Sequence, residues 1–197
     1  MTPLAQPLVT PAEYLALERR SPEKSEYVNG RVYAMAGASR LHNLIVANLL
    51  RELGTQLRGR PCEVYPSDMR VKVQRTGMYT YPDVVAVCEE PRLEDAELDT
   101  LLNPSLIVEV ISPSTESYDR GEKFAHYRRL DSLQEYVLVA QTLQRIEHFR
   151  REGEHWVLTE ISDPDGELAL ASLDCVLRLA DIYERVDFPA TRAVREG

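Results

Sequence analysis

The run Leu-Ile-Val-Glu-Val-Ile over residues 106–111 constrains the fold of this chain more than any other stretch. A continuous apolar run of this length, rich in β-branched residues, predicts a strand that is buried on both faces. Glu109 interrupts the run, and because side chains alternate along a strand, it shares a face with Ile107 and Ile111. An ionised carboxylate in such surroundings is costly unless it is paired or binds a cation. We therefore expect a functional site at Glu109, with one half of a structural ion pair as the alternative.

Length and charge limit the classes of protein to consider. The 197 residues, 44% of them hydrophobic, suit one domain with a core over about residues 25–140 and an extension over 141–185. No apolar run approaches the ~20 residues that span a membrane, and the N-terminus lacks the basic and apolar regions of a signal peptide. We therefore expect a cytoplasmic protein without a membrane partner. The net charge of −9 counts against a broad, non-specific grip on nucleic acid, but it does not exclude a local basic patch.

The three cysteines, Cys62, Cys88 and Cys175, are widely spaced and include no Cys-x-x-Cys pair. This pattern argues against a disulfide framework and against a zinc site. We expect all three to be small hydrophobic residues of the core.

Local patterns predict an ordered series of helices and strands. Thr10, Pro11 and Glu13 suit the start of a helix that ends near Arg20, and Asn29-Gly30 suits the turn of a hairpin. Ser39 suits the cap of an amphipathic helix. The further expected elements are a hairpin over 26–35, helices over 40–57, 119–130 and 179–186, strands over 62–65, 69–74, 79–88, 106–111, 135–140 and 168–177, and a solvent-facing hairpin over 145–161.

Three details of this series add to the expected fold. The strand over 69–74 alternates, so Arg70, Lys72 and Gln74 should face outward. The acidic stretch 89–103 should be an exposed insertion with at most one short helix. The order strand, helix, strand over 106–140 predicts a parallel pair with a right-handed crossover.

Two carboxylates, Asp83 and Glu109, enter otherwise apolar strands. If these strands are neighbours, the two carboxylates can converge on one divalent cation, and oxygen ligands suit Mg²⁺ or Mn²⁺. Such an ion can activate a water and stabilise a leaving oxygen of a phosphodiester, while a nearby lysine stabilises charge on phosphorus.

The ordered set of motifs resembles the Uma-type family of restriction-endonuclease-like proteins within the PD-(D/E)XK nuclease superfamily. The matching residues are Glu26, Asn29-Gly30, His42, Ser67-Asp68, Pro82-Asp83, Glu109 to Thr115, Asp119, Lys123, Tyr127 and Glu135-Tyr136. The resemblance implies an α/β (α+β) fold with an αβββαβ core, a mixed central sheet, an N-terminal helix and hairpin, and a β-rich C-terminal extension. It also implies a Mg²⁺-dependent or Mn²⁺-dependent endodeoxyribonuclease that takes DNA as its substrate, with Asp83 and Glu109 as the metal ligands.

The chain departs from the superfamily pattern at the catalytic lysine, because Ile111 stands two residues after Glu109. The resemblance suggests that Lys123 on the following helix replaces that lysine, although a solvated helix lysine is the alternative. Glu26, His42, Asp68 and Tyr127 are candidates for supporting roles, each with an ordinary structural interpretation beside it.

The acidic charge and the missing lysine motivate a second hypothesis, in which the chain is a catalytically degenerate nuclease fold that binds nucleic acid or protein. The hairpin over 145–161 could also pair across a two-fold axis, which would make the protein a homodimer.

Overall fold

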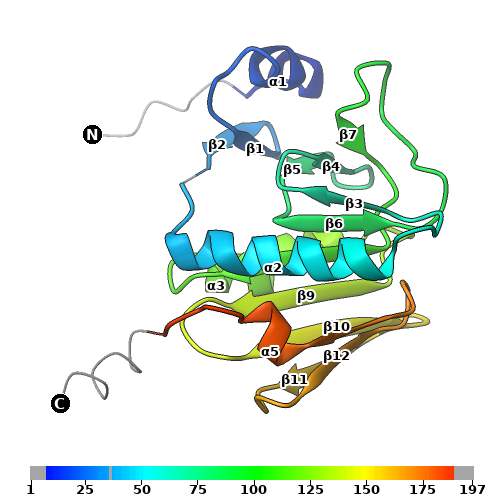
Figure 1. Ribbon diagram of the computed structural model, residues 1–197. Coiled ribbons are helices and arrows are strands. Elements are labelled where there is room, and N and C mark those ends of the chain that lie inside the picture. Colours follow the sequence, from blue (N-terminus) through cyan, green and yellow to red (C-terminus); the bar gives the residue numbers. More distant parts are fainter. Residues whose placement is uncertain (1–7, 36, 189–197) are drawn as a thin grey trace.

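The computed structural model describes residues 8–35 and 37–188 and contains two β-sheets and a separate hairpin (Figure 1). The larger sheet has the order β11-β10-β9-β8-β6-β3. Its strands are β3 (Glu63–Pro66), β6 (Val84–Val87), β8 (Leu106–Ile111), β9 (Glu135–Ala140), β10 (Ile146–Glu152) and β11 (His155–Ile161). The sheet is mixed, because β8 pairs with β6 in antiparallel and with β9 in parallel orientation.

The smaller sheet has the order β2-β1-β5-β4-β7 and carries α1 (Pro11–Glu18) on one face. Its strands are β1 (Ser25–Val28), β2 (Arg31–Ala34), β4 (Arg70–Val73), β5 (Met78–Thr80) and β7 (Thr100–Leu101). Tyr14 of α1 stacks on Tyr27 and also contacts Tyr79, which fixes the helix on the sheet. Thr10 and Glu13 form the expected capping box, and Asn29 and Gly30 adopt positive φ in the expected turn.

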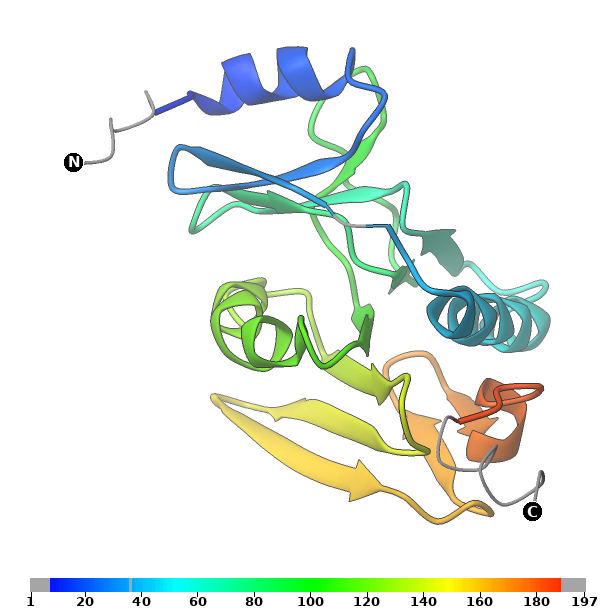
Figure 2. The same ribbon diagram turned by 90° about the vertical axis from the view of Figure 1, so that its left-hand side faces the viewer.

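Helices cover both faces of the larger sheet (Figure 2). One face packs against α2 (Arg40–Gln56), together with α5 (Leu179–Ile182) and the hairpin of β12 (Glu167–Leu170) and β13 (Cys175–Arg178). The other face packs against one continuous helical segment, formed by α3 (Glu116–Tyr118), the π-helical turn η1 (Asp119–Lys123) and α4 (Phe124–Tyr127).

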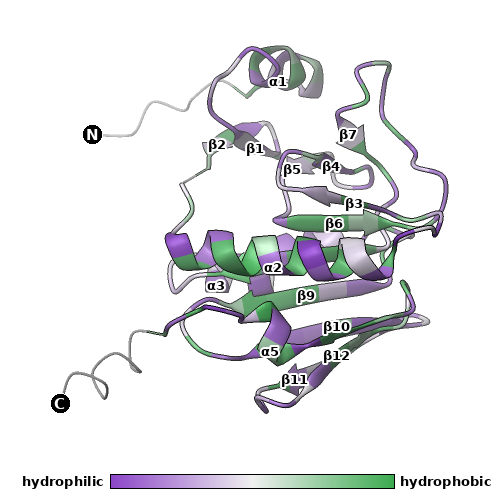
Figure 3. Ribbon diagram, viewed as in Figure 1, coloured by the Kyte–Doolittle hydropathy of each residue, from purple (hydrophilic) through white to green (hydrophobic). Residues whose placement is uncertain are grey.

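Burial on both faces explains the composition of the central strands. Val84 and Ala86 pack toward α2, whereas Val85 and Val87 pack toward the η1 side. β6 is therefore hydrophobic along its length, while α2 alternates between hydrophobic and hydrophilic residues (Figure 3). The expected αβββαβ order is confirmed by α2, β3, β6, β8, the α3–α4 segment and β9.

Two expectations about the strands need correction. The run 79–88 is not one strand, because the chain leaves the smaller sheet after Thr80 and enters the larger sheet at Val84. Arg70 does not face solvent: it is 4% exposed, and its guanidinium binds the Tyr81 hydroxyl and the Asp99 carboxylate. A buried guanidinium is tolerated here because polar oxygens surround it.

The acidic stretch and the C-terminal part also differ from expectation. Residues 89–103 contain no helix and end in the buried strand β7, which pairs with β4. The hairpin β10–β11 is only partly solvent-facing, because β10 begins with buried Ile146, Glu147 and His148. The stretch 168–177 is the hairpin β12–β13, and the last helix stops at Ile182.

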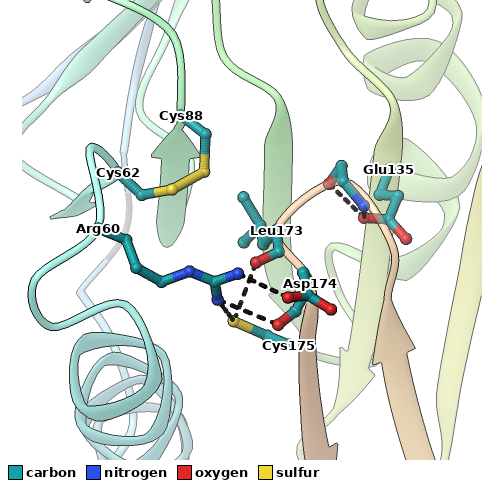
Figure 4. The surroundings of a disulfide bond; sticks show 8 residues. Arg60, Cys62, Cys88, Glu135, Leu173, Asp174 and Cys175 are labelled. Atoms are coloured by element: carbon teal, nitrogen blue, oxygen red, sulfur yellow. Dashed lines mark hydrogen bonds and ion pairs between the residues drawn. A yellow bond between two sulfur atoms is a disulfide. The ribbon is translucent and has the colours of Figure 1, made fainter.

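The prediction that all three cysteines are free was wrong, because Cys62 and Cys88 form a disulfide (Figure 4). The antiparallel register places Glu63 opposite Val87, so the residues just before β3 and just after β6 meet. Cys175 is a buried free thiol, as expected, and lies beside the Arg60 guanidinium that binds Asp174. In the described part of the chain, no helix has the length and hydropathy to cross a membrane.

Candidate active site

Asp83 and Glu109 lie at neighbouring positions of the larger sheet. Val84 pairs with Val108 across the antiparallel strands β6 and β8, so the residue before β6 stands next to Glu109. Asp83 Oδ2 accepts a hydrogen bond of 2.7 Å from the Val110 backbone N–H and lies 3.0 Å from His42 Nε2. An ionised carboxylate oxygen only accepts hydrogen bonds, so His42 and the Val110 N–H together fix this oxygen of Asp83.

Glu109 is 4% exposed and lies at the centre of a polar cluster inside the core. Its Oε1 accepts from the Tyr127 hydroxyl at 2.8 Å and lies 2.9 Å from Lys123 Nζ. Burial raises the pKa of Glu109 to about 8; the Lys123 ammonium acts against this rise, and the Asp83 charge adds to it.

Lys123 points into the site and not to solvent. It ends the π-helical turn η1, a geometry that is rare and often marks functional positions. Its Nζ lies 3.0 Å from Glu26 Oε1 and 3.7 Å from Asp119 Oδ1, in addition to Glu109. Burial alone would lower the pKa of Lys123, but the surrounding carboxylates raise it well above its usual value.

Glu26 reaches this cluster from the smaller sheet. Its Oε1 accepts from the Thr80 hydroxyl at 2.5 Å, and its Oε2 accepts from the Tyr118 hydroxyl at 3.2 Å. Glu26 and Lys123 therefore join the two sheets of the molecule at the candidate site.

The structure brings together six of the seven candidate residues and separates one. Glu26, Lys123, Glu109 and Tyr127 are joined by direct contacts, and the His42–Asp83 pair adjoins them through the Val110 backbone N–H and the position of Asp83 opposite Glu109. Asp68 lies outside this cluster, because its side chain is 84% exposed and pairs with Lys24 at 2.7 Å.

Sequence reasoning missed two members of the cluster, Thr80 and Tyr118. Asp119 was part of the family resemblance but was not among the candidate site residues; it precedes Lys123 by four residues, the helical spacing at which two side chains meet. Thr80 and Tyr118 carry no such signal, since Thr80 meets Glu26 only through the pairing of β5 with β1, and Tyr118 only through the packing of the smaller sheet against the α3–α4 segment.

The donor set fits a hard divalent cation. Among the described residues, Asp83 Oδ1 and Glu109 Oε2 accept no hydrogen bond, so one oxygen of each carboxylate is free. Within that same part of the chain, no group of three or more His, Cys, Asp or Glu side chains is arranged to hold a metal. Two carboxylates suffice for Mg²⁺, which keeps several waters and uses substrate phosphates as further ligands.

A family model and two relatives match most of the chain. The Uma2 family model, described as "Putative restriction endonuclease", matches residues 11–180. Two relatives from Synechocystis are named uncharacterized proteins sll1609 and slr1290. The first is 40% identical over 162 residues, which cover 82% of this chain and 92% of the relative. The second is 36% identical over 183 residues, which cover 92% of this chain and 95% of the relative.

A solved structure shares the fold. A protein from Anabaena variabilis, described as a "putative nuclease belonging to DUF820", superposes with a TM-score of 0.74. The match covers 89% of this chain and 97% of that chain at 16% sequence identity.

Proposed function

The chain belongs to the Uma2 family, and from this premise we propose that it is a metal-dependent endonuclease that hydrolyses phosphodiester bonds of DNA. The observation that carries the proposal is the meeting of Asp83 and Glu109 on adjacent antiparallel strands, with the Lys123 ammonium 2.9 Å from Glu109. Carboxylates beside a lysine in a buried polar cluster suit cation-assisted phosphoryl transfer.

The residues of the cluster have separable roles in this proposal. Asp83 Oδ1 and Glu109 Oε2 would hold Mg²⁺ or Mn²⁺, which supplies a water of lowered pKa and stabilises the leaving oxygen. His42 and the Val110 N–H orient Asp83, and Tyr127 orients Glu109. Lys123 carries the positive charge that stabilises the developing charge on the phosphate.

Metal binding is the first test. We expect calorimetric titration of Mn²⁺ into the native protein, with a short non-cleavable DNA analogue present, to show one site per chain. Asp83→Ala and Glu109→Ala should each abolish that heat, whereas Asp68→Ala should leave it unchanged because Asp68 lies outside the cluster. Equal binding by all four proteins would contradict the metal site.

Cleavage is the second test. We expect Mg²⁺-dependent nicking of plasmid DNA by the native protein and at least a hundredfold slower nicking by Lys123→Met, because this change removes the positive charge from the site. Chelation with EDTA should stop the native reaction. Robust cleavage by Lys123→Met would remove Lys123 from the mechanism.

One observation favours a second candidate, a degenerate nuclease fold that binds nucleic acid or protein. Lys123 is 5% exposed and is already neutralised by Glu26 and Glu109, so its ammonium is not free for a phosphate in this arrangement. Binding of DNA without any metal-dependent cleavage would favour this candidate.

A further inference from the structure

Tyr33 lies on the same face of the smaller sheet as the candidate site. The register of the β1–β2 hairpin places Tyr33 directly opposite Glu26, and directly opposed residues project to the same face. On the other side of Glu26, Thr80 of β5 donates to its carboxylate. Because Glu26 contacts Lys123, the row Thr80, Glu26 and Tyr33 runs from the buried cluster outward to the edge strand β2.

Packing does not account for the position of Tyr33. It is 50% exposed, and among the tyrosine, phenylalanine and tryptophan side chains of the described residues it alone is largely exposed. Within the same residues its hydroxyl makes no hydrogen bond, whereas Tyr14, Tyr27 and Tyr79 cluster on the opposite face of the sheet. An exposed aromatic ring beside a catalytic cluster offers a flat apolar surface to a ligand.

Arg31 adds a positive charge to the same face. It stands two residues before Tyr33 on β2 and opposite Val28, so its side chain projects toward the same side as Tyr33. Arg31 is exposed and forms no ion pair with any described residue. In a chain of net charge −9, an arginine that forms no ion pair with a described residue and shares a sheet face with Glu26 can bind an anion there.

We propose that Arg31 and Tyr33 form a substrate subsite on β2, where one base of a single-stranded DNA segment stacks on the Tyr33 ring and a neighbouring phosphate meets Arg31. The inference rests on the proposed function, since it states which form of DNA, a single strand, enters the site of Asp83 and Glu109. Stacking requires an open base face, which a single strand presents and an intact duplex does not. β2 carries no strand on its outer side among the described residues, so the subsite is open to a strand passing along this edge.

Fluorescence anisotropy with a short fluorescein-labelled oligothymidylate tests the subsite, in EDTA and again in Ca²⁺. Base stacking on an aromatic side chain contributes roughly 1–3 kcal/mol, so Tyr33→Leu should weaken binding by at least about fivefold. Tyr33→Phe should bind as the native protein does. Val32→Ala is the matched control, because Val32 is 41% exposed on the same strand but faces the other side, opposite Tyr27.

An oligonucleotide with abasic positions separates stacking from charge. With this probe, Tyr33→Leu should bind as tightly as the native protein does, whereas Arg31→Ala should still bind more weakly. Arg31→Ala should also lower the slope of log affinity against log salt by about 0.7, the value for one phosphate of a single strand.

Three results would overturn the subsite. The first is that Tyr33→Leu binds the oligonucleotide with native affinity, and the second is that Tyr33→Leu weakens binding to a blunt duplex by the same factor. The third is that the native protein binds no oligonucleotide in either condition. Failure of the proposed function is distinguishable from these. If Asp83→Ala and the native protein bind the strand equally, both with the Tyr33 dependence, and neither cleaves DNA, the subsite stands while the hydrolytic proposal falls.

Discussion

At the scale of single residues, the site is a balance of charge inside the core. One ammonium, Lys123, faces the carboxylates of Glu26, Glu109 and Asp119, and all four residues are at most 7% exposed. Like charges so close together are tolerated only because Lys123 offsets them and because burial raises the pKa of Glu109 and of Asp119. The lysine is therefore as important to stability as to the proposed chemistry.

Replacement of Lys123 by methionine tests this balance. We expect Lys123→Met to lower the free energy of unfolding by about 3–5 kcal/mol at pH 7, because it leaves buried carboxylates without a partner. Urea denaturation followed by circular dichroism measures the change. Lys24→Met is the control, since the Lys24–Asp68 pair is exposed and should contribute less than about 1 kcal/mol. Native stability in Lys123→Met would show that the carboxylates are protonated without cost.

Asp99 gives a prediction for pH dependence. It pairs with Arg19 at 2.9 Å and with buried Arg70 at 3.2 Å, and Arg19 is the main reason that the pKa of Asp99 is lowered to about 2. A carboxyl whose folded pKa is depressed stabilises the protein above its unfolded pKa, and that stabilisation is lost as the pH falls toward 2. Asp99→Asn should therefore be destabilised at pH 7, and the difference from the native protein should shrink between about pH 4 and 2.

Thermal melts of both proteins across this pH range measure the difference. Asp131→Asn serves as the control, because Asp131 is 79% exposed and lies 3.4 Å from a similarly exposed Arg75. A destabilisation of Asp99→Asn that stays constant down to pH 2 would contradict the role of the ionised carboxylate.

At the scale of elements, local sequence patterns correctly predicted the helix caps, turns and buried strands that depend on neighbouring residues in the chain. The capping box at Thr10, the Asn29-Gly30 turn and the helix that begins after Ser39 are all present, because each depends on neighbours in the chain. The buried strands β8 and β9 were likewise visible as apolar runs. Lys123 was placed correctly near Glu109 by the resemblance to a family and not by helical periodicity.

The missed features depend on contacts between distant segments. The apolar run 79–88 gives no sign that Pro82 lies where the chain crosses from one sheet to the other. The alternation over 69–74 predicted that Arg70 would be exposed, because its partners Tyr81 and Asp99 come from other elements. The disulfide escaped notice for the same reason, since only the pairing of β3 with β6 brings Cys62 to Cys88.

The disulfide should stabilise the β3–β6 pair measurably. It closes a loop with a sequence separation of 26 residues, and closing a loop of this size reduces the entropy of the unfolded chain. We expect reduction to lower the free energy of unfolding by roughly 2–4 kcal/mol. Urea denaturation with and without dithiothreitol measures this, and the Cys62→Ser, Cys88→Ser double variant should be insensitive to the reductant. A single free thiol in the denatured native protein, from Cys175, checks the bond itself.

At the scale of the whole molecule, two sheets meet around the site, and each ends, within residues 8–35 and 37–188, in a strand that is paired on one side alone. β2 ends the smaller sheet, and β11 ends the larger sheet with exposed Val157 and Leu158. An exposed, partly apolar edge strand is a surface for pairing with another chain. The pairing of the hairpin β10–β11 across a two-fold axis stays a prediction. The exposed edge strand β11 is the surface at which two copies of the chain would pair.

Light scattering coupled to size-exclusion chromatography tests the dimer. We expect twice the mass of the chain for the native protein and a shift to the single mass for Leu158→Lys, because a charge at this position disfavours strand pairing. Val176→Lys is the control, since Val176 is 47% exposed on a different strand. If the native protein has the mass of a single chain at every concentration, the prediction of a homodimer is wrong.

The π-helical turn η1 has a consequence for how the site can vary. A π-helical turn holds one residue more than an α-helical turn, and each residue of an α-helix advances its neighbours by about 100° around the axis. Both kinds of turn complete about one revolution, so deleting Gly121 would allow η1 to close into ordinary α-helix while the residues before and after the deletion keep their directions around the axis. Asp119, Lys123 and Tyr127 would then still face the same cluster. A deletion in the α-helical part of the segment would instead rotate the side chains on its two sides apart by about 100°, so the site should tolerate the loss of one residue at this exposed glycine better than a loss elsewhere in the segment.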